Sequence, residues 1–164
     1  MKTDPVQCYD SQGGILTKLK KGCYKCAGCI TCRQMPSGNS FRHPHTGKEI
    51  HIKHRITCTT AHVIYIITCP CGLTYFGKTQ NTLRERMGNH RSSMKRAIET
   101  GKSDLPLPKH FLLKGHGLPT LKFMSIDSVP EPNRGAVYWI RTLDTVAPRG
   151  LNKYCSFSPF LDKR

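Results

Sequence analysis

The chain has 164 residues, enough for one compact domain with a small appendage but not for two cores of equal size. Its 26 Lys and Arg residues against 10 Asp and Glu residues give a formal net charge of +16, which favours a polyanionic partner such as nucleic acid. No apolar run approaches the roughly 20 residues that cross a bilayer, and the N-terminus lacks the apolar stretch of a signal peptide, so we expect neither a membrane partner nor secretion.

The N-terminal part of the sequence is basic and then rich in cysteine. Residues 1–22 carry Gly13-Gly14 and several lysines with little periodicity, which predicts a flexible basic arm. Residues 23–60 hold most of the nine cysteines and predict a zinc-binding segment. Within it, Ile50, Ile52 and Ile56 stand at even spacing, as in one half-buried strand. A cytosolic or nuclear location is expected, and we favour the nuclear one; thiols stay reduced there and are free to bind metal.

Four cysteines recur at every third position and form three overlapping C-x-x-C pairs. Two thiolates at that spacing bind one tetrahedral zinc ion from a tight turn. Four so close together can hardly all reach one ion, so a distant ligand is expected, and Cys58 is the best candidate. We predict a first zinc site made by four of five residues: Cys23, Cys26, Cys29, Cys32 and Cys58. The alternative for these thiols is redox chemistry.

From residue 61 the pattern changes to strands and helices. A β-branched run over 61–68, a turn over 69–72 and a second run over 73–77 predict a hairpin. A helix over 81–99 follows, ended by Thr100-Gly101. One of its faces should be buried through Leu83, Met87, Met94 and Ile98.

The remaining elements complete a small domain. They are a loop over 104–108, a short helical turn over 109–115, a third strand over 121–127 and a second helix over 134–145. Ala136, Trp139, Ile140 and Leu143 form one stripe of that second helix. The sum is an α+β core over 61–155, a three-stranded antiparallel sheet flanked by helices, followed by a tail over 156–164.

Aromatic and basic residues stand on the hairpin and the first helix in a recognisable order. Val63-Ile-Tyr65 precedes Tyr75-Phe-Gly77, and Arg86 and His90 follow four residues apart. This order resembles the GIY-YIG endonuclease family, whose name comes from two such tripeptides on paired strands. Val63 replaces the first glycine of the pattern, and Phe76 replaces the isoleucine of the second tripeptide.

Further motifs resemble the endonuclease domain of Penelope-like retroelements, over about residues 23–155. They are Cys69-Pro-Cys-Gly72, Gly77-Lys-Thr79, His110-Phe-(x4)-His116 and Trp139-Ile…Pro148-Arg-Gly-Leu-Asn152. The resemblance implies a GIY-YIG-type fold and a DNA endonuclease that nicks its target to prime reverse transcription. It also implies structural Zn²⁺, catalytic Mg²⁺ or Mn²⁺, and a reverse transcriptase in the same polyprotein.

The resemblance assigns roles that phosphodiester chemistry requires. Tyr65 is expected to be the general base that acts on water, and Tyr75 to hold the phosphate or share that role. A phenol can relay a proton if nearby cations lower its pKa, which is about 10 in water. Arg86 lies on the same helical face as His90 and would clamp the charged phosphate. The alternative is that both tyrosines only pack between strands.

Three further predictions are less specific. His90 is expected to tune a tyrosine or contact the phosphate, or to be structural. Lys78 should neighbour the phosphate, and Asn152 should orient the active-site backbone or the DNA, unless it is a turn residue. The expected nucleic-acid-binding cations are Lys78, Arg84, Arg86 and Arg91.

A second metal site is suggested by Cys69 and Cys71 with His110 and His116, an arrangement that Penelope-like domains resemble. An ion there would pin the hairpin to the following helix and so fix the direction of Tyr65 and Tyr75. Cys8 and Cys155 have no predicted role. The histidines expected to be exposed or to face DNA are His43, His45, His51, His54 and His62.

One expected residue is missing. The family holds its divalent metal with a Glu on the later helix, three residues before the Trp-Ile pair, and here that position is Ala136. Alanine offers no oxygen to a hard cation. Either Ala136 inactivates the chain, or the segment is shortened, or Glu131 or Asp144 substitutes. We therefore expect poor cleavage or none.

Two other classes of function compete with the nuclease. A zinc-stabilised nucleic-acid-binding module without catalysis fits the charge, the cysteines and Ala136. A thiol-redox or metal-storage protein fits the C-x-x-C series but leaves the tyrosines and Arg86 unexplained.

Overall fold

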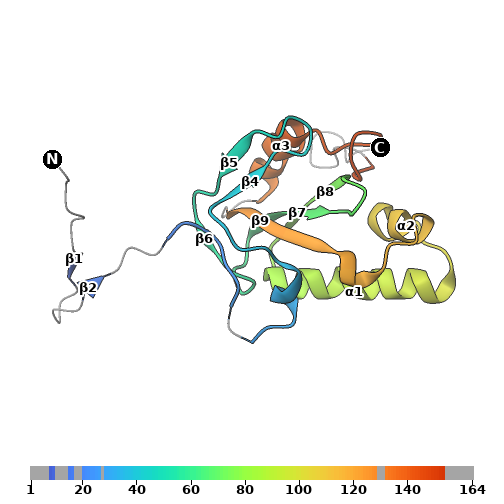
Figure 1. Cartoon of the computed structure of the whole chain (residues 1–164), viewed down its shortest axis with the longest axis horizontal. Helices are drawn as coiled ribbons and strands as arrows, with labels where there is room; N and C mark the ends of the chain where they lie inside the picture. The colour runs from blue at the N-terminus through green and yellow to red at the C-terminus, as the bar shows by residue number, and fades with distance from the viewer. Residues whose placement is uncertain (1–7, 10–14, 17–19, 27, 129–131, 154–164) are drawn as a thin grey trace.

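The computed structural model of the chain describes residues 8–9, 15–16, 20–26, 28–128 and 132–153 (Figure 1). The strands are β1 (Cys8–Tyr9), β2 (Ile15–Leu16), β3 (Gly22–Cys23), β4 (Ser40–Arg42), β5 (Glu49–His51), β6 (Arg55–Ile56), β7 (Val63–Thr68), β8 (Thr74–Thr79) and β9 (Lys122–Ser128). The helices are α1 (Leu83–Thr100), α2 (Pro106–Leu113) and α3 (Pro132–Leu143), with the 3₁₀ turns η1 (Thr31–Gln34) and η2 (Leu118–Thr120). Small antiparallel sheets with helices confirm the coarse α+β prediction. The predicted basic arm lies mostly outside the described residues, and the predicted tail over 156–164 lies entirely outside them.

β7 is the middle strand of a three-stranded antiparallel sheet whose order is β8-β7-β9. Its first five residues are buried, as expected for a β-branched strand covered on both faces. The predicted hairpin is confirmed: the backbone N–H of Cys69 donates to the carbonyl of Leu73 at 2.9 Å, and β7 pairs with β8. Tyr65 stands opposite Gly77, and Ile64 stands opposite Lys78. Because side chains alternate along a strand, Lys78 points to the sheet face away from Tyr65.

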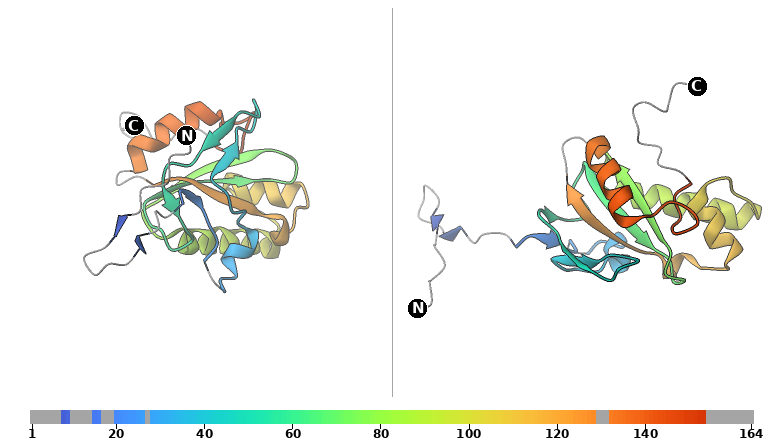
Figure 2. Two further views of the ribbon diagram at one scale, coloured as in Figure 1. Left: turned by 60° about the vertical axis from the view of Figure 1, so that its left-hand side comes forward. Right: turned by 90° about the horizontal axis from the view of Figure 1, so that it is seen from above.

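α1 and α3 cover opposite faces of this sheet (Figures 1 and 2). α1 begins with a capping box between Thr82 and Glu85 and ends at Gly101 in the left-handed conformation. Its inward face contains Leu83, Met87, His90, Met94 and Ala97. The prediction for Ile98 is wrong, since this side chain is 53% exposed. Spacing of alternately four and three residues from Leu83 brings Ala97, not Ile98, toward the sheet.

The later helices differ from the predictions mainly in where they begin. α2 begins at Pro106, inside the segment predicted to be a loop, because proline at the first position of a helix loses no helical hydrogen bond. α3 has the predicted stripe: Ala136, Trp139, Ile140 and Leu143 are all buried. No helix in the part of the chain that the structure describes is both long and apolar enough to span a membrane.

The cysteine-rich segment packs directly on the sheet and shares its core. Met35, Phe41, Ile52 and Ile56 belong to the same cluster of buried side chains as β7 and β9. The prediction of one strand through the three isoleucines is wrong. The chain bends after β5, which pairs with β4, and β6 instead pairs in parallel with β3.

Candidate active site and metal-binding clusters

Tyr65, Arg86 and His90 form a buried hydrogen-bonded chain between β7 and α1. The Arg86 Nε–H donates to the Tyr65 hydroxyl oxygen at 2.8 Å, and that hydroxyl lies 2.7 Å from His90 Nε2. Burial, helped by the charge of Arg86, lowers the pKa of His90 to about 3. The imidazole is therefore neutral, and its Nε2 pairs with the Tyr65 hydroxyl. The three side chains form one hydrogen-bonded chain, from Arg86 through Tyr65 to His90.

Tyr65 is fully buried in this structure and has no contact with solvent. Its exposed fraction is 0%. Burial and the neighbouring Tyr75 raise the pKa of Tyr65 well above its usual range, in spite of the Arg86 guanidinium. A phenol that is buried and protonated cannot deprotonate a water in the cavity. The expectation that Tyr65 acts as general base is therefore not supported by its surroundings.

Gly77 makes room for the Tyr65 ring. A Cβ atom at Gly77 would lie 2.3 Å from both Cζ and the hydroxyl oxygen of Tyr65. Real Cβ atoms do not approach other atoms so closely, so only glycine fits opposite Tyr65. The last residue of the second tripeptide thus determines where the first tyrosine lies, a role that the sequence analysis did not assign.

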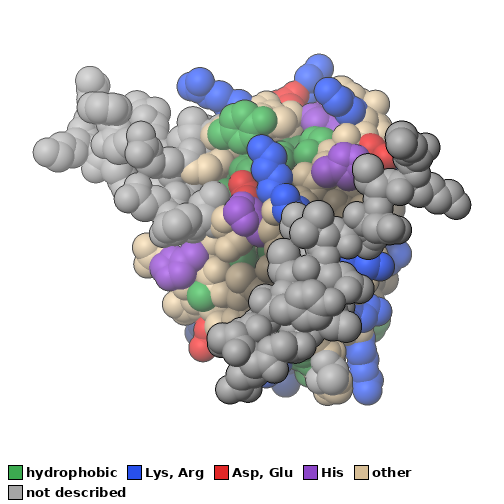
Figure 3. Space-filling view, turned by 90° about the vertical axis from the view of Figure 1, so that its left-hand side faces the viewer, with side chains coloured by type: hydrophobic (Ala, Val, Ile, Leu, Met, Phe, Trp, Pro, Cys, Tyr) green, Lys and Arg blue, Asp and Glu red, His purple; other side chains and the backbone are tan. Residues whose placement is uncertain are grey.

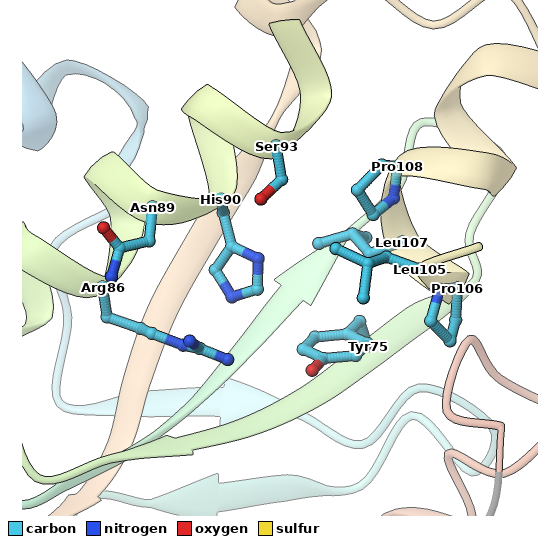
Figure 4. Close-up of a pocket in the computed structure, with 9 residues that line it drawn as sticks. All are labelled: Tyr75, Arg86, Asn89, His90, Ser93, Leu105, Pro106, Leu107 and Pro108. Carbon is cyan, nitrogen blue, oxygen red and sulfur yellow. The ribbon is translucent and has the colours of Figure 1, made fainter. Parts of the chain in front are cut away.

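Tyr75, Arg86 and His90 border an open cavity of about 180 Å³. In Figure 4 the Arg86 guanidinium extends toward Tyr75, and the His90 ring lies above the guanidinium. Tyr75 is half-buried; burial raises its pKa, and Arg86 partly opposes that shift. The structure therefore brings together four predicted site residues, of which Tyr65 lies behind the cavity and the other three line it.

The other predicted catalytic residues do not join this group. Lys78 faces the α3 side of the sheet, where burial lowers its pKa. Ala136 is completely buried on α3, which packs against that side. Glu131 lies outside the described residues, and Asp144 binds Arg149 at the surface.

Asn152 orients the backbone of β8, one of its two predicted roles. Its Nδ2 donates to the Phe76 carbonyl at 2.8 Å, and the Phe76 N–H donates to its Oδ1 at 2.8 Å. Phe76 is the central residue of the second tripeptide, between Tyr75 and Gly77. The Asn152 amide thus makes, at the outer edge of β8, the two backbone hydrogen bonds that a further strand would make. The adjacent Leu151 N–H donates to the Thr74 carbonyl at 3.0 Å and extends the pairing.

Four of the five cysteines predicted for the first metal site come together: Cys26, Cys29, Cys32 and Cys58. Their sulfur atoms all lie within 4.8 Å of one another, and that of Cys58 lies 3.1 Å from Cys26 and 3.8 Å from Cys29. Thiolates around a tetrahedral zinc ion are about 3.8 Å apart. The group could therefore hold one ion. Burial raises the pKa of Cys29, but hydrogen bonds from the Cys32 backbone and Cys58 outweigh it and lower the pKa to about 6.

Cys23, the fifth candidate, lies apart from that group. It is buried in β3, and burial raises the pKa of its thiol to about 11. A thiol that packs in the apolar core, outside the group of four neighbouring sulfur atoms, is a packing residue rather than a ligand to that ion.

The second predicted set, Cys69, Cys71, His110 and His116, also comes together. Nε2 of His110 lies 3.1 Å from Cys69 Sγ and 3.2 Å from Cys71 Sγ. Nε2 of His116 is buried and has no hydrogen-bond partner among the described residues. A buried, unpaired imidazole nitrogen beside two thiols is suited to metal binding. This cluster links the β7–β8 turn to α2.

Arg84 and Arg91, two of the cations predicted to bind nucleic acid, also make contacts within the chain. Arg84 Nη2 lies 3.5 Å from the sulfur atoms of Cys26 and Cys58, and its backbone N–H donates to the Cys58 carbonyl at 2.7 Å. Arg91 donates to the side chains of Thr31 and Gln34 in η1 at 3.2 and 3.1 Å. Both arginines join α1 to the cysteine-rich segment.

The histidines outside the clusters divide into two groups. His45, His51, His54 and His62 are exposed, as predicted. His43 is half-buried, and its Nε2 pairs with the carbonyl of Thr142 near the end of α3 at 2.6 Å. This contact could not be predicted from the sequence, because the two residues are 99 positions apart.

Sequence reasoning also missed Asn89 and Ser93, which line the cavity beside His90. Their spacing from Arg86, on one helical face, was the available signal. Comparison of the chain with protein-family models, curated proteins and solved structures found no match in any of the three.

Proposed function

We propose that the chain is a GIY-YIG-type DNA endonuclease domain with an impaired metal site, stabilised by two zinc ions. The observation that carries the proposal is the convergence of Tyr75, Arg86 and His90 on one open cavity, with Tyr65 fixed behind them. A phosphate can enter this cavity and reach both a guanidinium and a phenol. The narrower assignment to a Penelope-like retroelement, with nicking to prime reverse transcription, rests on the sequence resemblance.

Arg86 is the residue assigned to the phosphate. Its Nε is committed to Tyr65, which fixes the side chain and directs the outer nitrogens toward Tyr75 (Figure 4). A preorganised guanidinium stabilises charge that develops on a phosphate without having to reorganise first. The neutral His90 does not compete for the phosphate by charge. Its role is to hold the Tyr65 hydroxyl.

Tyr75 is the phenol assigned to the attacking water, because it reaches the cavity and Tyr65 does not. Burial raises the pKa of Tyr75, so the phenol stays protonated at neutral pH and cannot take a proton from water without an additional cation. A divalent ion, Mg²⁺ or Mn²⁺, therefore belongs to the proposal. The chemistry that such an ion supplies is a lower pKa for bound water.

A carboxylate for that ion is missing from the described lining of the cavity, which contains no Asp or Glu. Ala136 is buried on the other side of the sheet and offers no oxygen. This observation favours a second candidate, a zinc-stabilised nucleic-acid-binding module without catalysis. In that case Arg86 and Tyr75 bind a phosphate but do not cleave the chain that carries it.

Charge supports a nucleic-acid partner for both candidates. The net charge is +16, and Lys and Arg side chains project from the face shown in Figure 3 with few acidic side chains between them. Such a surface attracts phosphate backbones through counterion release, so binding should weaken steeply with salt.

Nicking of supercoiled plasmid DNA by the zinc-loaded chain in Mg²⁺ tests the proposal. We expect slow nicking that Arg86→Ala abolishes and that Arg96→Ala, at an exposed position of the same helix, leaves unchanged. Because position 136 lies on the face of the sheet opposite the cavity, Ala136→Glu, if circular dichroism shows that it folds, should nick no faster than the natural chain. Faster nicking by Ala136→Glu would place the divalent metal on the α3 side of the sheet and contradict the assignment of the reaction to this cavity. No nicking by either form, with DNA binding retained, supports the second candidate.

A further inference from the structure

The cavity beside Arg86 extends beyond the place proposed for the phosphate, toward the start of α2. Leu105, Pro106, Leu107 and Pro108 at the start of α2 form one wall. On α1, Ser93 faces this wall, and Asn89 lines the cavity at its far end, beside Arg86 (Figure 4). A phosphate anion gains nothing from an apolar wall. This half must therefore suit a group that is apolar on its face and polar at its edge.

The polar wall has free hydrogen-bonding capacity. Arg86, Asn89, His90 and Ser93 follow the i, i+3, i+4, i+7 pattern and so lie on one face of α1. On this face, Arg86 and His90 already pair with the Tyr65 hydroxyl. Neither the Asn89 amide nor the Ser93 hydroxyl bonds to any residue that the structure describes. An amide offers both a donor and an acceptor to a ligand edge.

The apolar wall is stiff and open to solvent. Leu105 is 54% exposed at the cap of α2, where it makes no side-chain capping bond. Two prolines follow at alternate positions and fix the backbone. A rigid wall of this kind presents a flat apolar surface at little entropic cost when a planar ring packs against it.

We propose that this half of the cavity binds the base of an unpaired nucleotide next to the phosphate held by Arg86. The inference rests on the proposed function for the phosphate half. A nucleobase has an apolar face and a hydrogen-bonding edge, which match the two walls. The whole cavity measures about 180 Å³ and is open to solvent, so a base can enter this half while its phosphate stays at the Arg86 end. A base stacked in continuous duplex cannot enter, so the substrate class is DNA with an unpaired nucleotide at the reacting position.

Binding of three labelled DNAs by the zinc-loaded full chain, followed by fluorescence anisotropy in Ca²⁺, tests this site. The DNAs are a duplex with a single-nucleotide bulge, the same bulge without its base, and the continuous duplex. We expect the bulge with its base to bind roughly tenfold more tightly than the baseless bulge. Leu105→Ala and Asn89→Ala should each bring that ratio close to one. Leu113→Ala, which removes a leucine that is 73% exposed at the other end of α2, should leave it unchanged.

Arg86→Ala separates this inference from the proposed function. It should weaken binding of both bulged DNAs equally and preserve their ratio, because it removes the phosphate contact alone. A ratio near one for the natural chain overturns the base site even if nicking depends on Arg86. A high ratio that survives Leu105→Ala and Asn89→Ala, with both variants folded by circular dichroism, also overturns it. Binding that does not respond to Arg86→Ala counts against the proposed function instead.

Discussion

The Tyr65 ring lies across the Cα atom of Gly77, and this contact determines where its hydroxyl meets Arg86 and His90. An added Cβ atom would lie 2.3 Å from the phenol, so Gly77→Ala must displace the ring or the strand. We expect the free energy of unfolding to fall by about 2 kcal/mol. Gly88→Ala in α1 is the control, since its Cβ would meet nothing within 4 Å, and it should stabilise the chain by about 1 kcal/mol. Urea denaturation measures both. An unchanged stability for Gly77→Ala would show that the ring is not held there.

His90 predicts a loss of stability in acid. Its pKa is about 3 in the folded chain and about 6.5 when unfolded. Above pH 6.5 the imidazole is neutral in both states. As the pH falls below about 6.5, the unfolded chain binds a proton that the folded chain cannot, so stability declines until the folded pKa is reached, by up to about 4 kcal/mol.

His90→Gln removes this titration and keeps a hydrogen-bonding side chain beside Tyr65. The difference in unfolding free energy between the natural chain and His90→Gln should therefore shrink as the pH falls from 6.5 toward 4. Zinc release in acid affects both proteins alike and cancels in the comparison. A difference that is constant over this range would mean that His90 titrates normally and is not buried as a neutral ring.

Residue groupings that follow from order along the chain could be predicted from the sequence, whereas those that depend on packing could not. Arg86, His90 and the two tyrosines were predicted as one group because their order along the chain resembles a known pattern. Burial of Tyr65 was not predictable, since it depends on α1 closing over β7. Lys78 was predicted beside the phosphate because it directly follows Gly77. Strand alternation places it on the opposite face of the sheet from Tyr65, since Lys78 stands opposite Ile64.

α1 is the element that connects the first metal cluster to the candidate active site. Arg84 touches two of the cluster's sulfur atoms, and Arg86 stands two residues further along. Four thiolates around Zn²⁺ carry a net charge of −2, and the Arg84 guanidinium neutralises part of it. We expect Arg84→Ala to speed zinc transfer to a chromogenic chelator by about tenfold. Arg96→Ala, an exposed cation on the same helix, should transfer zinc at the natural rate. Equal rates of zinc transfer in all three proteins would show that Arg84 does not stabilise the bound zinc.

Long elements with a strong pattern were predicted well, and short ones were not. The β7–β8 hairpin was predicted from its β-branched runs and the turn between them, and α1 from the spacing of its apolar residues and from Thr100-Gly101 at its end. The break between β5 and β6 was missed because three isoleucines at even spacing look the same in one strand as in two. Their pairing partners, β4 and β3, lie on segments too short to show a periodicity of their own.

At the scale of the whole molecule, the cysteine-rich segment is a layer of the core rather than a separate appendage. Its buried side chains join those of the sheet, and Arg84 and Arg91 tie its turns to α1. The second cluster performs the same task for α2 and the hairpin turn. Metal binding at the two clusters should therefore stabilise the fold on two sides of the cavity. A small domain gains more stability from such links than a large domain does, because its hydrophobic core buries a smaller share of its surface.

Zinc content per chain distinguishes the cysteines that bind metal from the one that only packs. The natural chain should carry two zinc ions, one for each cluster. Cys58→Ser should carry one and melt at a lower temperature, because Cys58 joins the cluster to the first residues of α1. Cys23→Ser is the matched control: it also replaces a buried thiol, but one that lies outside both clusters, and it should keep both ions. Loss of an ion from Cys23→Ser, with Cys58→Ser fully loaded, would move the first site to the other choice of four cysteines. Arg84 would then contact only one metal-bound sulfur atom, that of Cys26, and the link from the metal to the active-site helix through Cys58 would fail.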